Sequence, residues 1–263
     1  MASFDQAAYD YDREFTHTAV GRMQRDRVWH FLQSSLDGQP MKILELNCGT
    51  GEDACYLASL GHEVWATDAS ESMLELAKKK AENQGVEKNL HFQTWDLTQM
   101  NALNEKDFDL VFSNFAGLNC LDENRMISLG EELSHIVKPT GKVLAVYLST
   151  HCLWEQYYLR FKGRGKEAKR RATGEAVEVP VSGKFVTTWY YNPNQLEQQW
   201  SSHWQVNRIK PIGLFLPPSY LNPFFEKRKG ILNGLNALEK SLGTLDNWSN
   251  YADHFLMEWE VKR

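Results

Sequence analysis

The chain has 263 residues, of which 42% are hydrophobic, 24% charged and 12% aromatic. This composition is typical of a globular protein and excludes a disordered chain. The net charge of −5 gives no overall basic field, so we expect no duplex nucleic acid as a partner. The four cysteines form no C-x-x-C pair, which indicates reduced thiols in a cytoplasmic protein and argues against a disulfide framework.

Neither of two candidate segments has the features of an export signal or a membrane span. Residues 1–11 carry Asp5 and Asp10 and lack an apolar run, so they do not resemble a signal peptide. Residues 211–225 contain four prolines and are shorter than the roughly 20 residues that a membrane helix needs. We therefore expect no membrane partner.

The first part of the chain alternates between helices and buried strands. Val28, Leu32 and Leu36 recur every four residues, which predicts an amphipathic helix. The apolar run 41–46 predicts a strand that leads into the glycine turn 47–51. The same alternation then predicts a helix at 52–60, a strand at 62–67 ending in Asp68, a helix capped by Ser70 that ends before Gly85, and a strand at 90–95 closed by Asp96.

The alternation continues to residue 148 and then changes. We predict a strand at 108–114, a helix with Leu129, Leu133, Ile136 and Val137 on one face, a turn at 138–141 and a strand at 142–148. Strands that alternate with helices indicate a parallel sheet. Beyond 148 we predict an inserted hairpin of 177–181 and 185–191 around Ser182-Gly183, a helix that starts at Asn192-Pro193, and strands at 204–212 and 255–261.

The glycine turn predicts a small-ligand site, because glycine lets backbone N–H groups and a helix N-terminus approach a ligand. Gly49, Gly51 and Ala54 also fit the dinucleotide pattern G-x-G-x-x-A, and Asp68 ends the next strand as a ribose-binding carboxylate does. Glu45 distinguishes a dinucleotide site from a site for a cationic ligand. A carboxylate beside the turn repels the pyrophosphate of a dinucleotide and tolerates a cation. S-adenosylmethionine carries a sulfonium and an ammonium and no phosphate, so its charge fits better than that of NAD.

Several motifs resemble those of class I S-adenosylmethionine-dependent methyltransferases. The run Glu45-Leu46-Asn47-Cys48-Gly49-Thr50-Gly51 resembles the first motif, E-x-G-x-G-x-G, with Asn47 in place of the first glycine. Four further motifs follow in the family's order: Asp68-Ala69-Ser70-x-x-Met73, Trp95-Asp96-Leu97, Phe108-Asp109-Leu110-Val111 with Asn114, and Lys138-Pro139-x-Gly141. Phe4-Asp5-x-x-Ala8-x-x-Tyr11-Asp12 is similar to the opening of the subgroup that includes ubiquinone- and menaquinone-biosynthesis methyltransferases.

The resemblance implies a cofactor, S-adenosyl-L-methionine, lying along the carboxyl edge of the sheet. It implies that Asp68 accepts from the ribose hydroxyls and that Glu45 lies near the ammonium group. The remaining cofactor-binding residues that it implies are Asn47, Cys48, Gly49 and Gly51 around the methionine portion, Ala69, Met73, Asp96 and Leu97 around the adenine, Asn114 and Phe115 toward the acceptor, and Tyr11 as a cover.

Together these patterns predict a single domain over residues 1–263 with a doubly wound, Rossmann-like α/β fold. We expect a mostly parallel seven-stranded sheet with helices on both faces and an inserted lid hairpin. Its parts are an N-terminal helical cap (1–40), a cofactor-binding core (41–148), the inserted lid (149–191) and the C-terminal part of the sheet (192–263).

The expected function is methyl transfer to a small-molecule acceptor by direct displacement. A non-catalytic module that binds S-adenosylmethionine and, less favoured, an NAD-binding protein stay open as alternatives. No residue is identified as catalytic; Tyr147, His151 and Tyr190 are positional candidates for a base. No metal-ligand spacing occurs, and the oligomeric state is not indicated.

A basic run lies inside the predicted lid. Residues 160–171 hold seven Lys and Arg against Glu167 in an otherwise acidic protein. Most such runs are solvated surfaces, and the alternative is that this one helps to select a small acidic acceptor.

Overall fold

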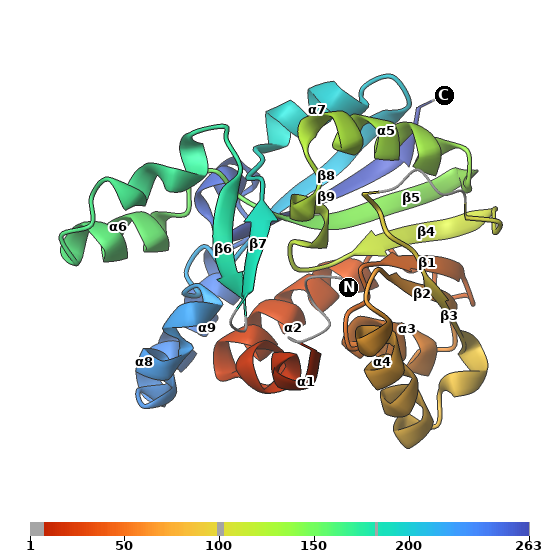
Figure 1. Ribbon diagram of the computed structural model, residues 1–263, viewed down its shortest axis with the longest axis horizontal. Helices are drawn as coiled ribbons and strands as arrows, with labels where there is room; N and C mark the ends of the chain where they lie inside the picture. Colours follow the sequence, from red (N-terminus) through yellow and green to blue (C-terminus); the bar gives the residue numbers. More distant parts are fainter. Residues whose placement is uncertain (1–7, 99–102, 182–183, 263) are drawn as a thin grey trace.

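The computed structural model describes residues 8–98, 103–181 and 184–262 (Figure 1). Its centre is a seven-stranded sheet with the strand order β3-β2-β1-β4-β5-β9-β8. The five strands from β3 to β5 run parallel, and β9 runs antiparallel to both β5 and β8. The strands are β1 (Lys42–Leu46), β2 (Glu63–Asp68), β3 (Leu90–Thr94), β4 (Phe108–Ser113), β5 (Val137–Leu148), β8 (Trp204–Ile212) and β9 (His254–Val261). This arrangement confirms the predicted doubly wound, mostly parallel sheet.

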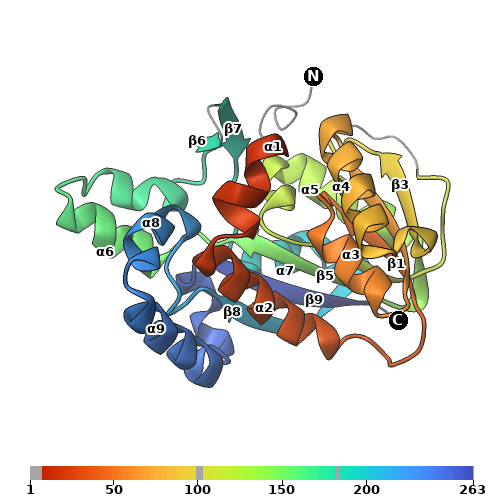
Figure 2. The ribbon, with the colours of Figure 1, turned by 90° about the horizontal axis from the view of Figure 1, so that it is seen from below.

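Helices cover both faces of the sheet (Figures 1 and 2). One face packs against α2, α3 and α4 through an apolar cluster that includes Val28, Leu57 and Leu74. The other packs against α5 and α7 through a cluster that includes Leu129 and Trp200. The helices are α1 (Ala8–Tyr11), α2 (Ala19–Gln33), α3 (Glu52–Ser59), α4 (Glu71–Gln84), α5 (Glu123–Ser134), α6 (Leu153–Phe161), α7 (Pro193–Trp200), α8 (Asn222–Glu226) and α9 (Lys229–Leu242).

Several helix ends are set by the local sequence as predicted. The Ser70 hydroxyl accepts a hydrogen bond from the backbone N–H of Met73, so it caps α4. Gly85 ends that helix in the left-handed conformation, with φ of 68°, which a glycine adopts without strain. Asn192 caps α7 through its side-chain oxygen, and Pro193 is the first helical residue.

The residues between α5 and β5 differ from the prediction. Helix α5 ends at Ser134, so Ile136 and Val137 do not lie on it as predicted. Strand β5 begins at Val137, which pairs with Phe108, and the turn expected at 138–141 falls within the bounds of this strand. The ladder contains a register shift between Phe108 and Leu110, so the proline and glycine occupy an irregular part of the strand. Residues 138–141 of β5 thus stand against Asp109 alone and form a bulge between the paired residues Val137 and Lys142.

The region after β5 contains the predicted hairpin and helices that the sequence pattern did not predict. Strands β6 (Val177–Val181) and β7 (Lys184–Thr188) pair antiparallel in a separate two-stranded sheet. The predicted turn, Ser182-Gly183, lies outside the described residues. The helices α6, α8 and α9 were not predicted; together they form one end of the molecule. Among the described residues, no helix has the length and apolar character of a membrane span.

Candidate functional site

The glycine turn follows β1 and adopts a left-handed backbone at three positions. Asn47, Gly49 and Gly51 have φ values of 55°, 54° and 76°. Asparagine tolerates this region better than most residues, which explains how Asn47 replaces a glycine here. A Cβ on Gly51 would lie 2.7 Å from the Cβ of Ala77, so glycine is needed for the close approach of α4. The turn is thereby fixed against both β2 and α4.

Asp68 joins the turn to the end of β2. Its carboxylate accepts hydrogen bonds of 2.9 Å from the backbone N–H groups of Gly49 and Ser70. Its carbonyl oxygen accepts from the N–H of Trp95, which brings the end of β3 alongside. The first three motifs of the sequence therefore meet at one edge of the sheet.

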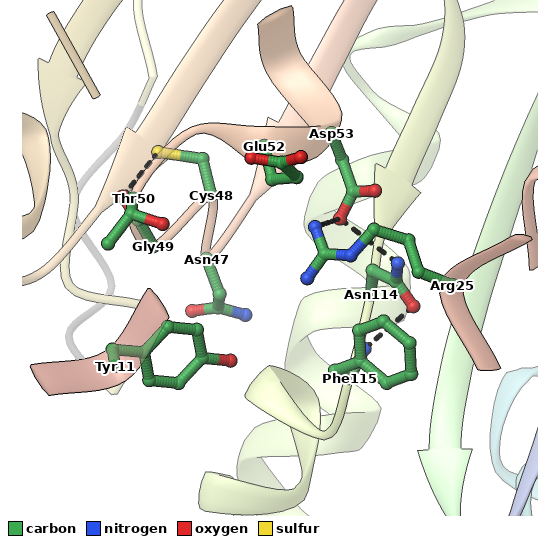
Figure 3. A pocket seen from close by; sticks show the side chains of 10 residues that line it. All are labelled: Tyr11, Arg25, Asn47, Cys48, Gly49, Thr50, Glu52, Asp53, Asn114 and Phe115. Atoms are coloured by element: carbon green, nitrogen blue, oxygen red, sulfur yellow. Dashed lines mark hydrogen bonds and ion pairs between the residues drawn. The ribbon is translucent and has the colours of Figure 1, made fainter. Parts of the chain in front are cut away.

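A small cavity lies beside the turn (Figure 3). Its volume of about 20 Å³ is room for about one water molecule. Six of its ten lining residues were predicted from the sequence, namely Tyr11, Asn47, Cys48, Gly49, Asn114 and Phe115. The other four were not predicted from the sequence; they are Arg25, Thr50, Glu52 and Asp53.

Arg25 and Asp53 form a buried ion pair in the wall of this cavity, with 3.1 Å between Nη1 and Oδ2. The Asp53 carboxylate also accepts hydrogen bonds from the Asn114 side-chain amide and the Trp29 indole N–H. The Arg25 guanidinium lies 5.1 Å from the centre of the Phe115 ring. Arg25 could have been found in the sequence, because it precedes Val28 by three residues and therefore shares its buried helix face.

Glu45 lies behind the turn and is 1% exposed. Its Oε2 atom has no hydrogen-bond partner among the described residues. Burial, and then the nearby Asp53 carboxylate, raise the pKa of Glu45 well above its ordinary value, although Arg25 opposes the shift. Such a carboxyl group ionises readily only when a cation lies close to it.

The N-terminal segment lies over the turn and is fastened to it. Asp12 accepts a hydrogen bond from the Thr50 hydroxyl at 2.6 Å and forms an ion pair with Lys80 at 3.0 Å. The Phe15 ring packs edge-on against Phe115, with ring centres 4.9 Å apart. Burial raises the pKa of Tyr11 to about 12, so this phenol stays protonated beside the cavity.

The other predicted cofactor residues lie further along the same edge. Ala69 and Met73 begin the segment that follows β2, and Met73 is buried. Asp96 and Leu97 follow β3, where the Asp96 carboxylate accepts from the N–H and hydroxyl of Thr98. These four residues do not line the small cavity.

The three positional candidates for a base do not gather at the cavity either. Tyr147 is fully buried in the core, where its ring stacks on Phe255 at 5.5 Å. The His151 ring lies 2.8 Å from the Thr150 hydroxyl. Tyr190 lies under the Arg171 guanidinium, 5.0 Å from ring centre to carbon. Tyr147 is thus a structural residue.

Two residues of the basic run are neutralised within the fold. Arg171 is buried and forms ion pairs of 2.9 Å with both Glu155 and Asp253. Arg170 pairs with Glu155 at 2.9 Å. Because both guanidinium groups already have carboxylate partners, they attach the inserted segment to α6 and to the start of β9.

The known proteins that this chain resembles include methyltransferases. A family model described as a methyltransferase domain matches residues 43–141. A demethylmenaquinone methyltransferase of Leptospira interrogans is 30% identical over 146 residues, covering 54% of this chain and 57% of that protein. A tRNA 5-carboxymethoxyuridine methyltransferase of Escherichia coli is 26% identical over 154 residues, covering 57% of this chain and 58% of that protein. The matches thus span little more than half the length of these relatives.

A solved structure shares the fold over most of both chains. It is an S-adenosylmethionine dependent methyltransferase from Mesorhizobium loti, with a TM-score of 0.55 and 15% identity, covering 89% of this chain and 97% of that one. At this level of identity the likeness shows the fold alone. Residues 43–141 thus match a methyltransferase domain, and the motifs and the fold agree in supporting a class I S-adenosylmethionine-dependent methyltransferase with S-adenosyl-L-methionine as its cofactor.

Proposed function

We propose that the chain is a cytoplasmic enzyme that transfers a methyl group from S-adenosylmethionine to a small-molecule acceptor by direct displacement. The observation that carries this proposal is the meeting of the glycine turn, Asp68 and the end of β3 at one edge of the sheet. In doubly wound folds this carboxyl edge is where ligands bind.

The charges of the site fit the cofactor. Glu45 has an orphaned, buried carboxyl oxygen, which an ammonium group would satisfy. Arg25 lines the cavity and offers a guanidinium to a carboxylate. We assign these two residues to the two ends of the cofactor's amino-acid portion, and Cys48, Gly49 and Gly51 to its backbone contacts.

The remaining assignments follow the edge of the sheet. Asp68 is the acceptor for the ribose hydroxyls. Ala69, Met73, Asp96 and Leu97 surround the adenine, and Asn47, Asn114 and Phe115 lead from the methionine portion to the acceptor. Tyr11 covers the site.

The bound cofactor supplies an electrophilic methyl group on a sulfonium. The protein's part is then to orient the acceptor in line and to exclude water, and much of the catalysis comes from that positioning. The N-terminal segment, held by Asp12, and the inserted segment 149–191 are the two elements assigned to exclude water. No residue is assigned as a general base.

The alternative of NAD binding is disfavoured by the acidic surroundings of the turn. Glu45, Asp53 and Asp68 all lie close enough to interact electrostatically, and only Arg25 and Lys80 oppose them. A pyrophosphate in this place would add negative charge beside these acidic groups, which costs free energy.

Two classes of methyl acceptor are represented among the relatives, small molecules and tRNA. One relative is named for a quinone precursor and another for a modified tRNA nucleoside. The overall charge of −5 favours a small molecule over RNA, because RNA binding gains from net positive charge. Methyl transfer measured with a small-molecule panel and with tRNA in parallel decides between them.

Isothermal titration calorimetry tests the cofactor site directly. We expect S-adenosylmethionine and S-adenosylhomocysteine to compete for one site, and NAD to give no heat of binding. Asp68→Ala should weaken S-adenosylhomocysteine binding by about 1–3 kcal/mol, because the ribose hydroxyls lose their acceptor. Tight NAD binding, or unchanged affinity in a folded Asp68→Ala protein, would contradict the proposal; cofactor binding without turnover on any acceptor would favour the non-catalytic module.

A further inference from the structure

One end of the molecule, formed by α6, the segment 162–172, α8 and α9, has an unusual outer surface, which we call the cap face. Figures 1 and 2 both place these helices together, far from α3 and α4. Aromatic contacts join them, since Trp154 of α6 meets Phe225 of α8 with ring centres 5.7 Å apart. The cap face therefore belongs to one packed unit.

Helix α6 exposes an apolar stripe on this face. Tyr157 is 67% exposed and Phe161 is 89% exposed. Because they are four residues apart, their side chains lie on the same side of the helix. The opposite side of α6 is the packed one, with Glu155 and Leu159 buried.

Helix α9 exposes a second stripe. Ile231, Leu238 and Leu242 are 56%, 43% and 47% exposed and share one side of the helix by their spacing of seven and four. Only Leu232 and Glu239 of this helix are buried. Scattered apolar side chains on a surface are ordinary, whereas stripes on two helices that both contact α8 indicate an interaction surface.

Positive charge accompanies the two stripes. Residues 153–172 carry seven Lys and Arg against two Glu, and residues 219–242 carry four against two, in a protein whose net charge is −5. Arg170 and Arg171 are committed to Glu155 and Asp253. Arg164 pairs with Glu167 on the surface. The other exposed cations are Arg160, Lys162, Lys166, Lys169, Lys227, Arg228, Lys229 and Lys240.

We propose that the cap face binds the surface of an anionic lipid bilayer. The apolar stripes enter the boundary between headgroups and acyl chains, and the surrounding cations contact the anionic headgroups. The sequence-based expectation of no membrane partner concerned a spanning or exported segment, and contact with a bilayer surface is a different mode of binding. The proposal does not depend on the identity of the methyl acceptor.

Two features favour a bilayer over other occupants. A second copy of the chain would bring the same positive charge against itself, which costs free energy. RNA would gain from the cations and from Tyr157 or Phe161, but it has no use for the aliphatic side chains of Ile231, Leu238 and Leu242. An anionic bilayer offers a hydrocarbon boundary to the apolar stripes and negative headgroups to the cations.

Sedimentation of the full chain with vesicles tests the proposal. The vesicles contain phosphatidylcholine alone or phosphatidylcholine and phosphatidylglycerol in a two-to-one ratio. We expect binding to the anionic vesicles that weakens as salt rises, and at least a tenfold loss of affinity in Phe161→Ser/Ile231→Ser. The matched control is Leu60→Ser/Ile127→Ser, whose apolar residues are 47% and 42% exposed outside the cap face.

The outcomes are distinct from those for methyl transfer, since S-adenosylhomocysteine binding is measured on every variant as a check of the fold and cofactor site. Absence of binding to anionic vesicles at low salt overturns the proposal, and so does an equal loss in the control variant. A dimer in sedimentation equilibrium that Phe161→Ser/Ile231→Ser disrupts assigns the cap face to a second copy. Displacement of the vesicles by tRNA assigns it to nucleic acid.

Discussion

Asn47 occupies the space that a side chain on Gly117 would need. A Cβ built on Gly117 would lie 2.5 Å from the Cβ and 2.6 Å from the Cγ of Asn47. The residue that replaces the family's first glycine is thus accommodated by a glycine from the loop after β4. The two positions form a matched pair that links the glycine turn to the loop bearing Phe115.

This pairing predicts a rescue. Gly117→Ala should lower the free energy of unfolding by about 1–3 kcal/mol, the usual cost of overpacking. Asn47→Gly, which also relieves a left-handed φ, should remove most of that cost in the double variant. Urea denaturation of the four proteins in the cycle measures the coupling. Additive effects of the two substitutions would show that the side chains do not compete for this space.

Glu45→Gln should separate stability from binding. Because the pKa of Glu45 is raised in the folded protein, the ionised group opposes folding, and this cost appears as pH rises above the ordinary carboxyl value. The glutamine variant should therefore be more stable than the parent at pH 7, by about 1 kcal/mol, with a smaller difference at pH 4. Its affinity for S-adenosylhomocysteine should fall by about 1–3 kcal/mol, because a cationic ammonium loses a charged partner. A variant that is less stable at pH 7 would mean that Glu45 is ionised and paired in the free protein.

Asp12→Ala should speed the release of bound cofactor. Asp12 connects the N-terminal segment to Thr50 of the turn and to Lys80 of α4. Loss of both contacts should raise the off-rate about tenfold, equivalent to about 1.4 kcal/mol. Deletion of residues 1–15 should raise it at least as much. Arg13→Ala is the control, since Arg13 is exposed and pairs with Asp10; an unchanged off-rate in Asp12→Ala would leave the segment without a role as a cover.

Glu155→Gln should loosen the attachment of the inserted segment in a pH-dependent way. Burial alone would raise the pKa of Glu155, but Arg171 and Arg170 lower it to about 2 from 4.5. A depressed carboxyl pKa contributes stability above pH 4.5 that is lost as pH falls toward 2, here about 3 kcal/mol. The glutamine variant should be less stable than the parent at pH 7, and the two should converge near pH 2.

Denaturant titration at both pH values measures this effect. Glu167→Gln is the control, because Glu167 pairs with Arg164 on the exposed surface and its loss should leave unfolding nearly unchanged. Parallel pH profiles for parent and Glu155→Gln would show that the ion pair contributes no net stability.

Much of the core could be predicted because its signals are local. The caps at Ser70 and Asn192, the buried runs of the strands and the glycine turn each depend on a few adjacent residues. The bulge at Pro139 could not be predicted, since a proline and a glycine next to a helix usually indicate a turn. What places them in a strand is the pairing with β4, a contact between distant residues.

The motif residues of the candidate site could be predicted from the sequence. The site residues that depend on contacts between distant parts of the chain could not. Arg25 and Asp53 belong to different helices and meet only after α2 packs beside the turn. The left-handed backbone of Phe115 and Ala116 has no sequence signal either, because neither is a glycine. The ion pairs of Arg171 with Glu155 and Asp253 likewise join residues up to 82 positions apart.

The position of β9 has a consequence for how the protein is made. Strand β8 pairs only with β9, and β9 lies between β8 and β5. During synthesis, Trp204–Ile212 therefore leaves the ribosome about 40 residues before the strand that it pairs with, at rates of about 5–20 residues per second. Until His254–Val261 emerges and inserts between β5 and β8, the backbone groups of Val206 and Ile209 lack their partners on β9. An unpaired strand of this kind can pair with another chain and aggregate. We therefore expect the insertion of β9 to be the step that completes the sheet during synthesis. A stalled chain that lacks β9 should bind chaperones, because β8 then has no partner strand.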